Sequence, residues 1–270
     1  MGIFDGYLLV SDMDGTLFDD NKEVSAENKA AIDRFMAGGG KFTVATGRMR
    51  LAVERYFSEI TINAPAIMHN GALVYDFEKD KVISQKFIER DRKEIYKRIY
   101  NDRPDLGIEV YTADEHVYVY RNSVQSERFK NNIYPVSYSM PESVWDEDWL
   151  KILLLGDKKL LDDFEPIFRS KYDSGYAVRS GEDFFDIMAN GVSKGIGVDK
   201  TAEYLGISQD KVITVGDNMN DLSMLENRKL SFAVANAEDA AKRAAAMEAP
   251  DNNSAPIAYI INKLERDFIN

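Results

Sequence analysis

Apolar runs of strand length alternate with segments of helical periodicity in the first part of the chain. The runs at residues 7–10, 41–45 and 66–68 have the length and composition of buried strands. Apolar positions recur at helical spacing after Ser25, and a second helical segment starts at Met49. This β-α-β-α-β order predicts a parallel sheet with helices on its faces.

The alternation changes after Asp76, where a different kind of region begins. Residues 73–75 and 82–84 flank Glu78-Lys79-Asp80 in the manner of a β-hairpin. Further helices are expected at residues 91–100, 124–133 and 158–171, and further strands at residues 117–120, 152–155, 176–179 and 184–187. A block of this length, inserted between two parts of one sheet, predicts a separate α+β domain.

Strand and helix alternate again in the last part of the chain. Strands are expected at residues 212–215 and 232–234, and helices at residues 195–205, after Asn220, at residues 237–247 and at residues 257–268. We therefore predict the α/β class. A Rossmann-like parallel-sheet core would comprise residues 1–80 and 190–270, with an inserted α+β domain at residues 81–189.

The composition narrows the classes of partner and of chemistry. The chain has 34 basic and 46 acidic residues, and the net charge of 34 − 46 = −12 disfavours nucleic acid and anionic membranes as partners. No apolar run approaches the ~20 residues of a spanning helix, and no signal-peptide pattern opens the chain. A soluble, cytoplasmic protein is expected, and its oligomeric state stays open. With no cysteine and two histidines, carboxylates must supply most of the chemistry.

Polar residues follow the predicted strands at the ends where ligands bind in open α/β sheets. They are Asp12 and Asp14 after the first strand, Thr46 after the second, Asn70 after the third, and Gly216-Asp217-Asn218-Met219-Asn220-Asp221 after a later one. Lys194 opens the helix before that later strand. Carboxylate, hydroxyl and amide groups without thiolate or imidazole clusters favour a hard cation, and Mg²⁺ is the expected metal.

These side chains suit phosphoryl transfer. A carboxylate such as Asp12 can attack a phosphate once Mg²⁺ and a nearby lysine neutralise the opposing charges. Asp14, two residues further on, has the spacing to protonate the leaving oxygen and later to deprotonate water. Hydrogen bonds from Thr46, from the amides near Gly47 and from Asn220 would hold the phosphoryl oxygens.

Four motifs occur in order along the chain: Asp12-Met13-Asp14-Gly15-Thr16-Leu17, Thr46-Gly47-Arg48, Lys194, and Gly216-Asp217-Asn218-Met219-Asn220-Asp221. Together they resemble the signature of the haloacid dehalogenase superfamily of phosphohydrolases. Asn70-Gly71-Ala72, Gly191-Val192-Ser193-Lys194-Gly195 and the large insertion further resemble its Cof-like branch. One segment departs from that branch, because Asp251-Asn252-Asn253-Ser254 keeps an asparagine but lacks the Glu-Asp-Gly-Val that usually follows it.

The resemblance implies a role for each motif residue. Asp12 would be the nucleophile that forms an aspartyl-phosphate, and Asp14 would be the general acid and base. Mg²⁺ would be held by Asp12, by the backbone carbonyl of Asp14 and by Asp217, with Asp221 behind them. The phosphoryl group would be bound by Thr46, Gly47, Lys194 and Asn220. The inserted segment would be a cap that selects the substrate, commonly a sugar phosphate or another small phosphorylated metabolite.

Some assignments stay open at this stage. Candidates for substrate contact are Arg48, Arg179, Glu182 and Asp183, and Arg48 is equally interpreted as a surface residue. Asn70-Gly71 is more typical of a tight turn than of a functional group. Two alternatives to a phosphatase are a phosphomutase of the same superfamily and a phospho-accepting signalling or binding module without turnover.

Overall fold

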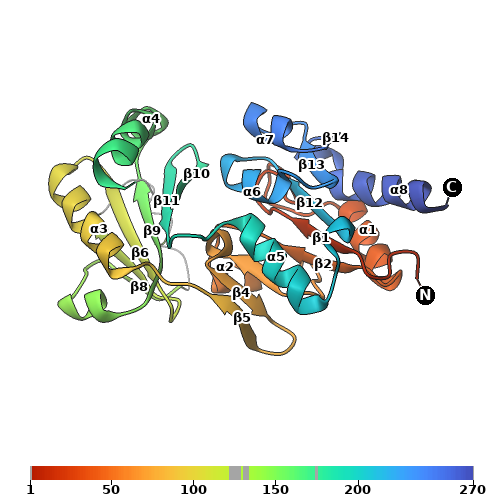
Figure 1. The fold of residues 1–270 in the computed structure, drawn as a ribbon, viewed down its shortest axis with the longest axis horizontal. Coiled ribbons are helices and arrows are strands. Elements are labelled where there is room, and N and C mark those ends of the chain that lie inside the picture. The colour runs from red at the N-terminus through yellow and green to blue at the C-terminus, as the bar shows by residue number, and fades with distance from the viewer. Residues whose placement is uncertain (1, 122–128, 130–133, 174–175, 270) are drawn as a thin grey trace. The chain divides into compact units, whose positions relative to one another are not determined.

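The chain forms two compact units (Figure 1). Unit 1 contains Met1–Gln85 and Ser193–Asn270, and unit 2 contains Lys86–Val192. The computed structural model describes residues 2–121, 129, 134–173 and 176–269. The predicted insertion began at residue 81, whereas β5 (Lys81–Gln85) is part of unit 1, where it pairs with β4 (Leu73–Asp76).

A five-stranded parallel sheet with the strand order β14-β13-β12-β1-β2 lies at the centre of unit 1. Its strands are β1 (Leu8–Ser11), β2 (Lys41–Val44), β12 (Val212–Gly216), β13 (Leu230–Val234) and β14 (Met247–Ala249). Every residue of β1 is buried, as expected for a strand covered on both faces. Ser11 pairs with Val44 of β2 and with Val215 of β12. The carboxyl ends of these three strands therefore lie side by side.

Helices pack around this sheet. α1 (Ala26–Ala37) packs against α8 (Pro256–Ile269), and α5 (Lys194–Leu205) packs against α6 (Leu222–Leu225). Unit 1 also contains the helices α2 (Arg50–Glu54) and α7 (Asp239–Ala244) and the 3₁₀ turn η5 (Gln209–Lys211). None of the helices that the structure describes combines the length and the apolar character needed to cross a membrane.

The third predicted strand belongs to a different sheet from the one expected. β3 (Ala66–Met68) pairs antiparallel with β4 in the three-stranded sheet β3-β4-β5. An isolated parallel bridge between Ala45 and Ile67 connects it to the chain just after β2. The physical reason is the turn η1 (His69–Gly71), whose residues have φ values of 48°, 54° and 100° and reverse the chain.

Unit 2 is built on a six-stranded sheet with the order β10-β11-β9-β6-β7-β8. Its strands are β6 (Gly107–Thr112), β7 (Val117–Arg121), β8 (Val136–Ser137), β9 (Trp149–Leu155), β10 (Ala177–Gly181) and β11 (Phe184–Met188). α3 (Arg90–Asp102) and α4 (Lys158–Ile167) contribute Tyr96 and Phe164 to an apolar core that also contains Trp149. The remaining turns are η3 (Glu142–Asp146) and the π-helical η4 (Phe168–Tyr172). Unit 2 thus has its own core, as a separate domain requires.

A strand of the structure was not predicted, a predicted helix is shorter than expected, and another lies almost entirely outside the described residues. The strand β6 was not predicted, because Glu109 interrupts its apolar pattern. The helix expected at residues 237–247 ends at Ala244, and Met247–Ala249 instead forms β14, which pairs in parallel with β13. The helix expected at residues 124–133 lies almost entirely outside the described residues.

Candidate active site

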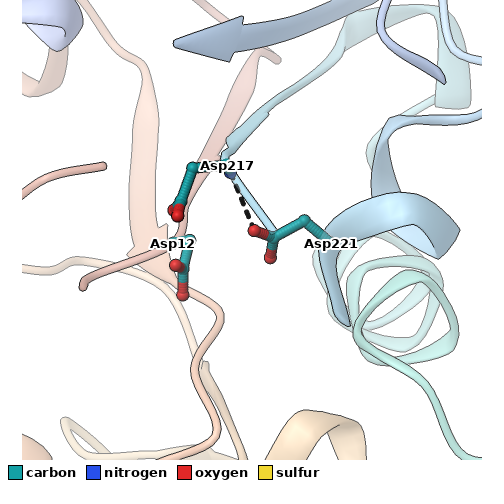
Figure 2. A group of neighbouring side chains, drawn as sticks. All are labelled: Asp12, Asp217 and Asp221. Atoms are coloured by element: carbon teal, nitrogen blue, oxygen red, sulfur yellow. Dashed lines mark hydrogen bonds between the residues drawn. The ribbon is translucent and has the colours of Figure 1, made fainter. Parts of the chain in front are cut away.

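Three aspartates meet at the carboxyl ends of β1 and β12 (Figure 2). Asp12 directly follows β1, Asp217 directly follows β12, and Asp221 ends the 3₁₀ turn η6 (Met219–Asp221). One carboxylate oxygen from each residue lies within 4.8 Å of the others. The Asp12 N–H donates to the Val215 carbonyl at 2.9 Å, so sheet pairing brings the first two aspartates together.

The ammonium of Lys194 joins two of these aspartates. Nζ lies 2.6 Å from Asp12 Oδ1 and 2.7 Å from Asp221 Oδ1, and the Lys194 side chain is fully buried. Ser193 caps α5 by accepting a hydrogen bond from the Ile196 N–H, which places Lys194 in the first turn of that helix. Burial opposes the charge of Lys194, but the charges of Asp12 and Asp221 outweigh it and raise the pKa of Lys194. The site therefore holds a permanent cation.

The start of α5 lies directly against the turn η1. Gly71 has a φ of 100°, and a Cβ on this residue would lie 2.1 Å from the Ser193 carbonyl oxygen. Glycine alone permits both this backbone conformation and this approach. The turn after β3 thus sets the position from which Lys194 reaches the aspartates.

Three carboxylates, those of Asp12, Asp217 and Asp221, lie around the ammonium of Lys194, so this group carries more negative than positive charge. Burial and the charge of Asp221 raise the pKa of Asp12 well above its ordinary value, although Lys194 acts in the opposite direction. The same two causes, opposed by the Thr16 hydroxyl and by Lys194, raise the pKa of Asp217 to about 7. A divalent cation with oxygen ligands would offset this deficit, and the carboxylates of Asp12 and Asp217 are the ligand type that Mg²⁺ prefers.

The oxygens of Asp221 are bonded to protein groups. Oδ2 accepts the backbone N–H groups of Asp217 and Asn218, both at 2.9 Å, and Oδ1 accepts from Lys194. Asn218 and Asp221 together form a capping box around η6. Asp221 therefore shapes the loop that presents Asp217, which suits the outer position predicted for it.

The carboxylate of Asp14 is bonded to Arg48 instead of joining the acidic group. Arg48 Nε and Nη2 donate to its two oxygens at 2.7 Å each, and Lys22 Nζ lies 3.2 Å from Oδ1. The guanidinium carbon lies 5.1 Å from the ring centroid of Tyr56. Burial raises the pKa of Asp14, but the hydrogen bonds and charge of Arg48, together with Lys22, lower it overall. Arg48, a candidate for substrate contact, is thus bound to Asp14 in this structure.

Thr46, Asn70 and Asn220 are linked by hydrogen bonds. The Asn70 N–H donates to the Thr46 carbonyl at 2.9 Å, and Asn220 Nδ2 donates to Asn70 Oδ1 at 3.1 Å. A Cβ on Gly47 would also lie 3.1 Å from Asn70 Oδ1. Asn220 Oδ1 is buried and accepts no hydrogen bond from the residues that the structure describes.

Asn70 was predicted mainly as a turn residue, and the structure also brings it next to Thr46 and Asn220. It forms the expected turn, with a φ of 54°, and its backbone N–H and its side chain together link Thr46 and Asn220, two residues predicted to bind phosphate. The signal in the sequence was its position within two residues of the end of a strand, which it shares with Asp12 and Thr46.

Comparisons with known proteins give the family. A family model described as haloacid dehalogenase-like hydrolase matches residues 9–261. The chain belongs to this family. The expected superfamily, the α/β fold class and the expected enzyme class, a phosphoric monoester hydrolase of haloacid dehalogenase type, are thereby confirmed.

Individual relatives of this haloacid dehalogenase-like hydrolase match over nearly their whole length. The pyridoxal phosphate phosphatase YbhA of Escherichia coli is 27% identical, covering 94% of this chain and 97% of that protein. The 5-amino-6-(5-phospho-D-ribitylamino)uracil phosphatase YitU of Bacillus subtilis is 24% identical, with coverages of 95% and 97%. The crystal structure of TM0651 from Thermotoga maritima has a TM-score of 0.78 and 25% identity, with coverages of 95% and 97%.

The other candidates for substrate contact in this haloacid dehalogenase-like hydrolase lie in unit 2. Arg179 Nη1 is 2.7 Å from Asp162 Oδ1 on α4, and its guanidinium also donates to the carbonyls of Gly181 and Glu182. The Asp183 carbonyl accepts the Gly156 N–H at 3.3 Å. Arg179 therefore holds the turn between β10 and β11, and substrate contact by Arg179, Glu182 or Asp183 stays a prediction.

Proposed function

We propose that this chain is a Mg²⁺-dependent phosphatase that hydrolyses small phosphorylated metabolites, with sugar phosphates the expected class, through an aspartyl-phosphate on Asp12. The observation that carries the proposal is the buried contact of Lys194 with Asp12 and Asp221, beside Asp217, at the ends of two adjacent strands. A lysine without exposed surface among carboxylates suits an anion-binding reaction centre.

In the first half-reaction, Asp12 is the nucleophile. Its carboxylate oxygen attacks phosphorus, the bond from phosphorus to the leaving oxygen breaks, and the leaving oxygen takes a proton from the Asp14 carboxyl. Lys194 neutralises part of the charge that otherwise keeps the Asp12 carboxylate and the phosphate apart. Thr46, Gly47 and Asn220 are proposed to donate hydrogen bonds to the phosphoryl oxygens.

In the second half-reaction, Asp14 is the general base. As a carboxylate it removes a proton from water, the water oxygen attacks phosphorus, and the bond to Asp12 breaks to release inorganic phosphate. Arg48 lowers the pKa of Asp14, so the arrangement seen here suits this base role. The proton taken from water restores the acid needed for the next cycle.

Mg²⁺ would be held by the carboxylates of Asp12 and Asp217 and by the backbone carbonyl of Asp14. When bound, it supplies positive charge to the phosphoryl group and the nucleophile. The substrate class is supported by two relatives whose names state small phosphorylated substrates, pyridoxal phosphate and 5-amino-6-(5-phospho-D-ribitylamino)uracil.

The test is a phosphate-release screen over a panel of phosphorylated metabolites, with Mg²⁺ and with EDTA. Activity should require Mg²⁺, and Asp12→Asn should lower kcat by about 10⁴-fold or more. Asp33→Asn, an exposed aspartate on α1, is the matched control and should keep full activity. Release that persists in EDTA, or an active Asp12→Asn variant, contradicts the proposal. Activity that appears only with a bisphosphate activator indicates a phosphomutase, and phosphorylation without turnover indicates a signalling module.

A further inference from the structure

The loop after β1, residues 13–20, carries Asp14 and Thr16 without containing a helix or a strand. The Thr16 hydroxyl donates to Asp217 Oδ1 at 2.6 Å. Gly15 has a φ of 79°, and a Cβ on it would lie 2.7 Å from Asp217 Oδ2. The loop backbone therefore lies in direct contact with a predicted metal ligand, so a small displacement of the loop would move that ligand or the Asp14 carbonyl.

Two asparagines from the carboxyl-terminal part of the chain bind this loop. Asn236, after β13, donates from Nδ2 to the Gly15 carbonyl at 2.8 Å. Asn252, in the turn η7 (Asn252–Ser254), donates from Nδ2 to the Phe18 carbonyl and to Asp20 Oδ1, both at 3.1 Å. The Asn252 N–H in turn donates to Asn236 Oδ1 at 2.9 Å. The Asn252 backbone is thus bonded to the Asn236 side chain, and the two side-chain amides donate to three acceptors of one loop.

The same segment also binds the loop that carries Asp217. The Glu238 N–H, two residues after Asn236, donates to the Asp217 carbonyl at 2.8 Å. Residues 236–238 therefore connect the two loops that would supply the metal ligands. Substituting a residue that orients a metal ligand commonly lowers the metal affinity by about 10- to 100-fold.

Asn252 is also connected, through Phe18, to the ion pair formed by Asp14 and Arg48. The Phe18 N–H donates to the Met13 carbonyl at 2.9 Å, and Asn252 fixes the Phe18 carbonyl, so both polar groups of the Phe18 backbone are held. The Phe18 ring centroid lies 5.8 Å from the Arg48 guanidinium carbon, and Arg48 binds Asp14. Asn252 is 6% exposed, so a carbonyl that loses this donor would stay largely without solvent.

We propose that Asn236 and Asn252 are positioning residues that set the metal affinity and the turnover rate of the site by holding residues 13–20. The inference rests on the proposed metal-dependent phosphatase and assigns a role to the asparagine of the segment that departs from the family branch. Neither residue contacts the reacting atoms. The amide is required at both positions, because a carboxylate of the same shape cannot donate to the Gly15 or Phe18 carbonyl.

The experiment compares Asn236→Ala and Asn252→Ala with Asn63→Ala. Asn63 is the matched control, since it also joins two backbone groups, accepting the Phe42 N–H at 2.7 Å and donating to the Gly40 carbonyl at 3.1 Å, but at the amino end of β2. For each purified full chain, Mg²⁺ binding is measured by calorimetry, the Tm is measured in EDTA, and kcat and KM are measured on the best substrate.

Asn236→Ala and Asn252→Ala should each weaken Mg²⁺ binding roughly 10-fold and lower kcat, with a smaller change in KM. Asn63→Ala should lower the Tm comparably and leave Mg²⁺ affinity at the wild-type value. Asn236 is exposed, so its variant is expected to fold even where Asn252→Ala does not.

Two results would overturn the inference in distinguishable ways. If the wild type binds Mg²⁺ and hydrolyses phosphates while Asn236→Ala matches it in Mg²⁺ affinity and kcat, these asparagines are only structural. If the wild type itself binds no Mg²⁺, the proposed function fails, and the positioning role fails with it.

Discussion

At the residue scale, the bond between Arg48 and Asp14 lowers the pKa of a carboxyl that is proposed to work as acid and as base. Arg48→Ala removes two hydrogen bonds and a charge that lower the pKa of Asp14, so this pKa should rise. The acidic limb of the rate profile should then move to higher pH, and kcat should fall by about 100-fold as Asp14 loses its orientation. The measurement is kcat against pH.

Arg50→Ala is the control for this variant. Arg50 lies on α2 and bonds to the Tyr75 hydroxyl, away from Asp14, so its pH profile should match that of the wild type. An unchanged profile in Arg48→Ala would show that Asp14 does not limit the acidic limb. Arg48→Lys, which keeps the charge without the two parallel hydrogen bonds, should fall between the two.

Asp217 gives a second expectation at this scale, for the metal-free protein. Its pKa rises from an ordinary 3.8 to about 7, so the folded protein holds this proton more tightly than the unfolded chain does. Its contribution to stability is complete below the unfolded value and is lost as pH rises through about 7. Mg²⁺ needs the carboxylate, so the rise in Tm caused by Mg²⁺ should be larger at pH 8 than at pH 6.

The pH dependence of this Mg²⁺ effect is read from thermal melts with and without the metal across that range. Asp217→Asn should lose most of the Mg²⁺ effect at every pH, and Asp33→Asn should retain it. A Mg²⁺-induced Tm rise in the wild type that is equal at both pH values would exclude this titration.

At the scale of elements, the contact between the turn η1 and the start of α5 determines the position of Lys194, the first residue of that helix. Gly71→Ala combines a φ of 100° with a Cβ that would lie 2.1 Å from the Ser193 carbonyl oxygen, so α5 must shift. Gly206→Ala is the matched control, because Gly206 has a φ of 67° but nothing within 4 Å of the added Cβ.

The two glycine variants separate backbone strain from displacement of the helix. Gly206→Ala should cost about 1 to 2 kcal/mol of unfolding free energy and leave kcat unchanged. Gly71→Ala should cost more and also lower kcat for every substrate, because Lys194 moves with α5. Denaturant unfolding and steady-state kinetics measure both effects, and equal kcat in the two variants would refute the coupling.

Elements were predicted from sequence where one local pattern dominated. β1, β2 and β12 end in polar clusters and were found, as was the hairpin of β4 and β5. β14 was misassigned to a helix, because alanines up to Ala246 favour helix locally while pairing with β13 decides the structure. β6 was missed because Glu109, although fully buried, has a polar side chain that hides the strand pattern. In both cases tertiary contacts outweighed the local signal.

At the scale of the whole molecule, the motif residues could be placed together because parallel strands end at one edge of a sheet. The bonding of Asp14 to Arg48 and the contacts of Asn236 and Asn252 could not be predicted, since these side chains bind residues that lie between 34 and 234 positions away in the sequence. Sequence spacing carries no information about such contacts. The prediction of an inserted domain rested on the points where the alternation of strands and helices stopped and resumed along the sequence.

The two-unit organisation leads to an expectation about substrate choice. The motif residues of unit 1 are proposed to bind the phosphoryl group, which all phosphorylated substrates share, so we expect discrimination between leaving groups to come from unit 2. Glu182→Ala and Asp183→Ala, in the turn that Arg179 holds, should change kcat/KM unequally among phosphorylated metabolites. Thr46→Ala should lower kcat/KM for all of them by a similar factor. The measurement is a kcat/KM ranking over one substrate panel, and a ranking reordered by Thr46→Ala but kept by both unit 2 variants would place selectivity in unit 1.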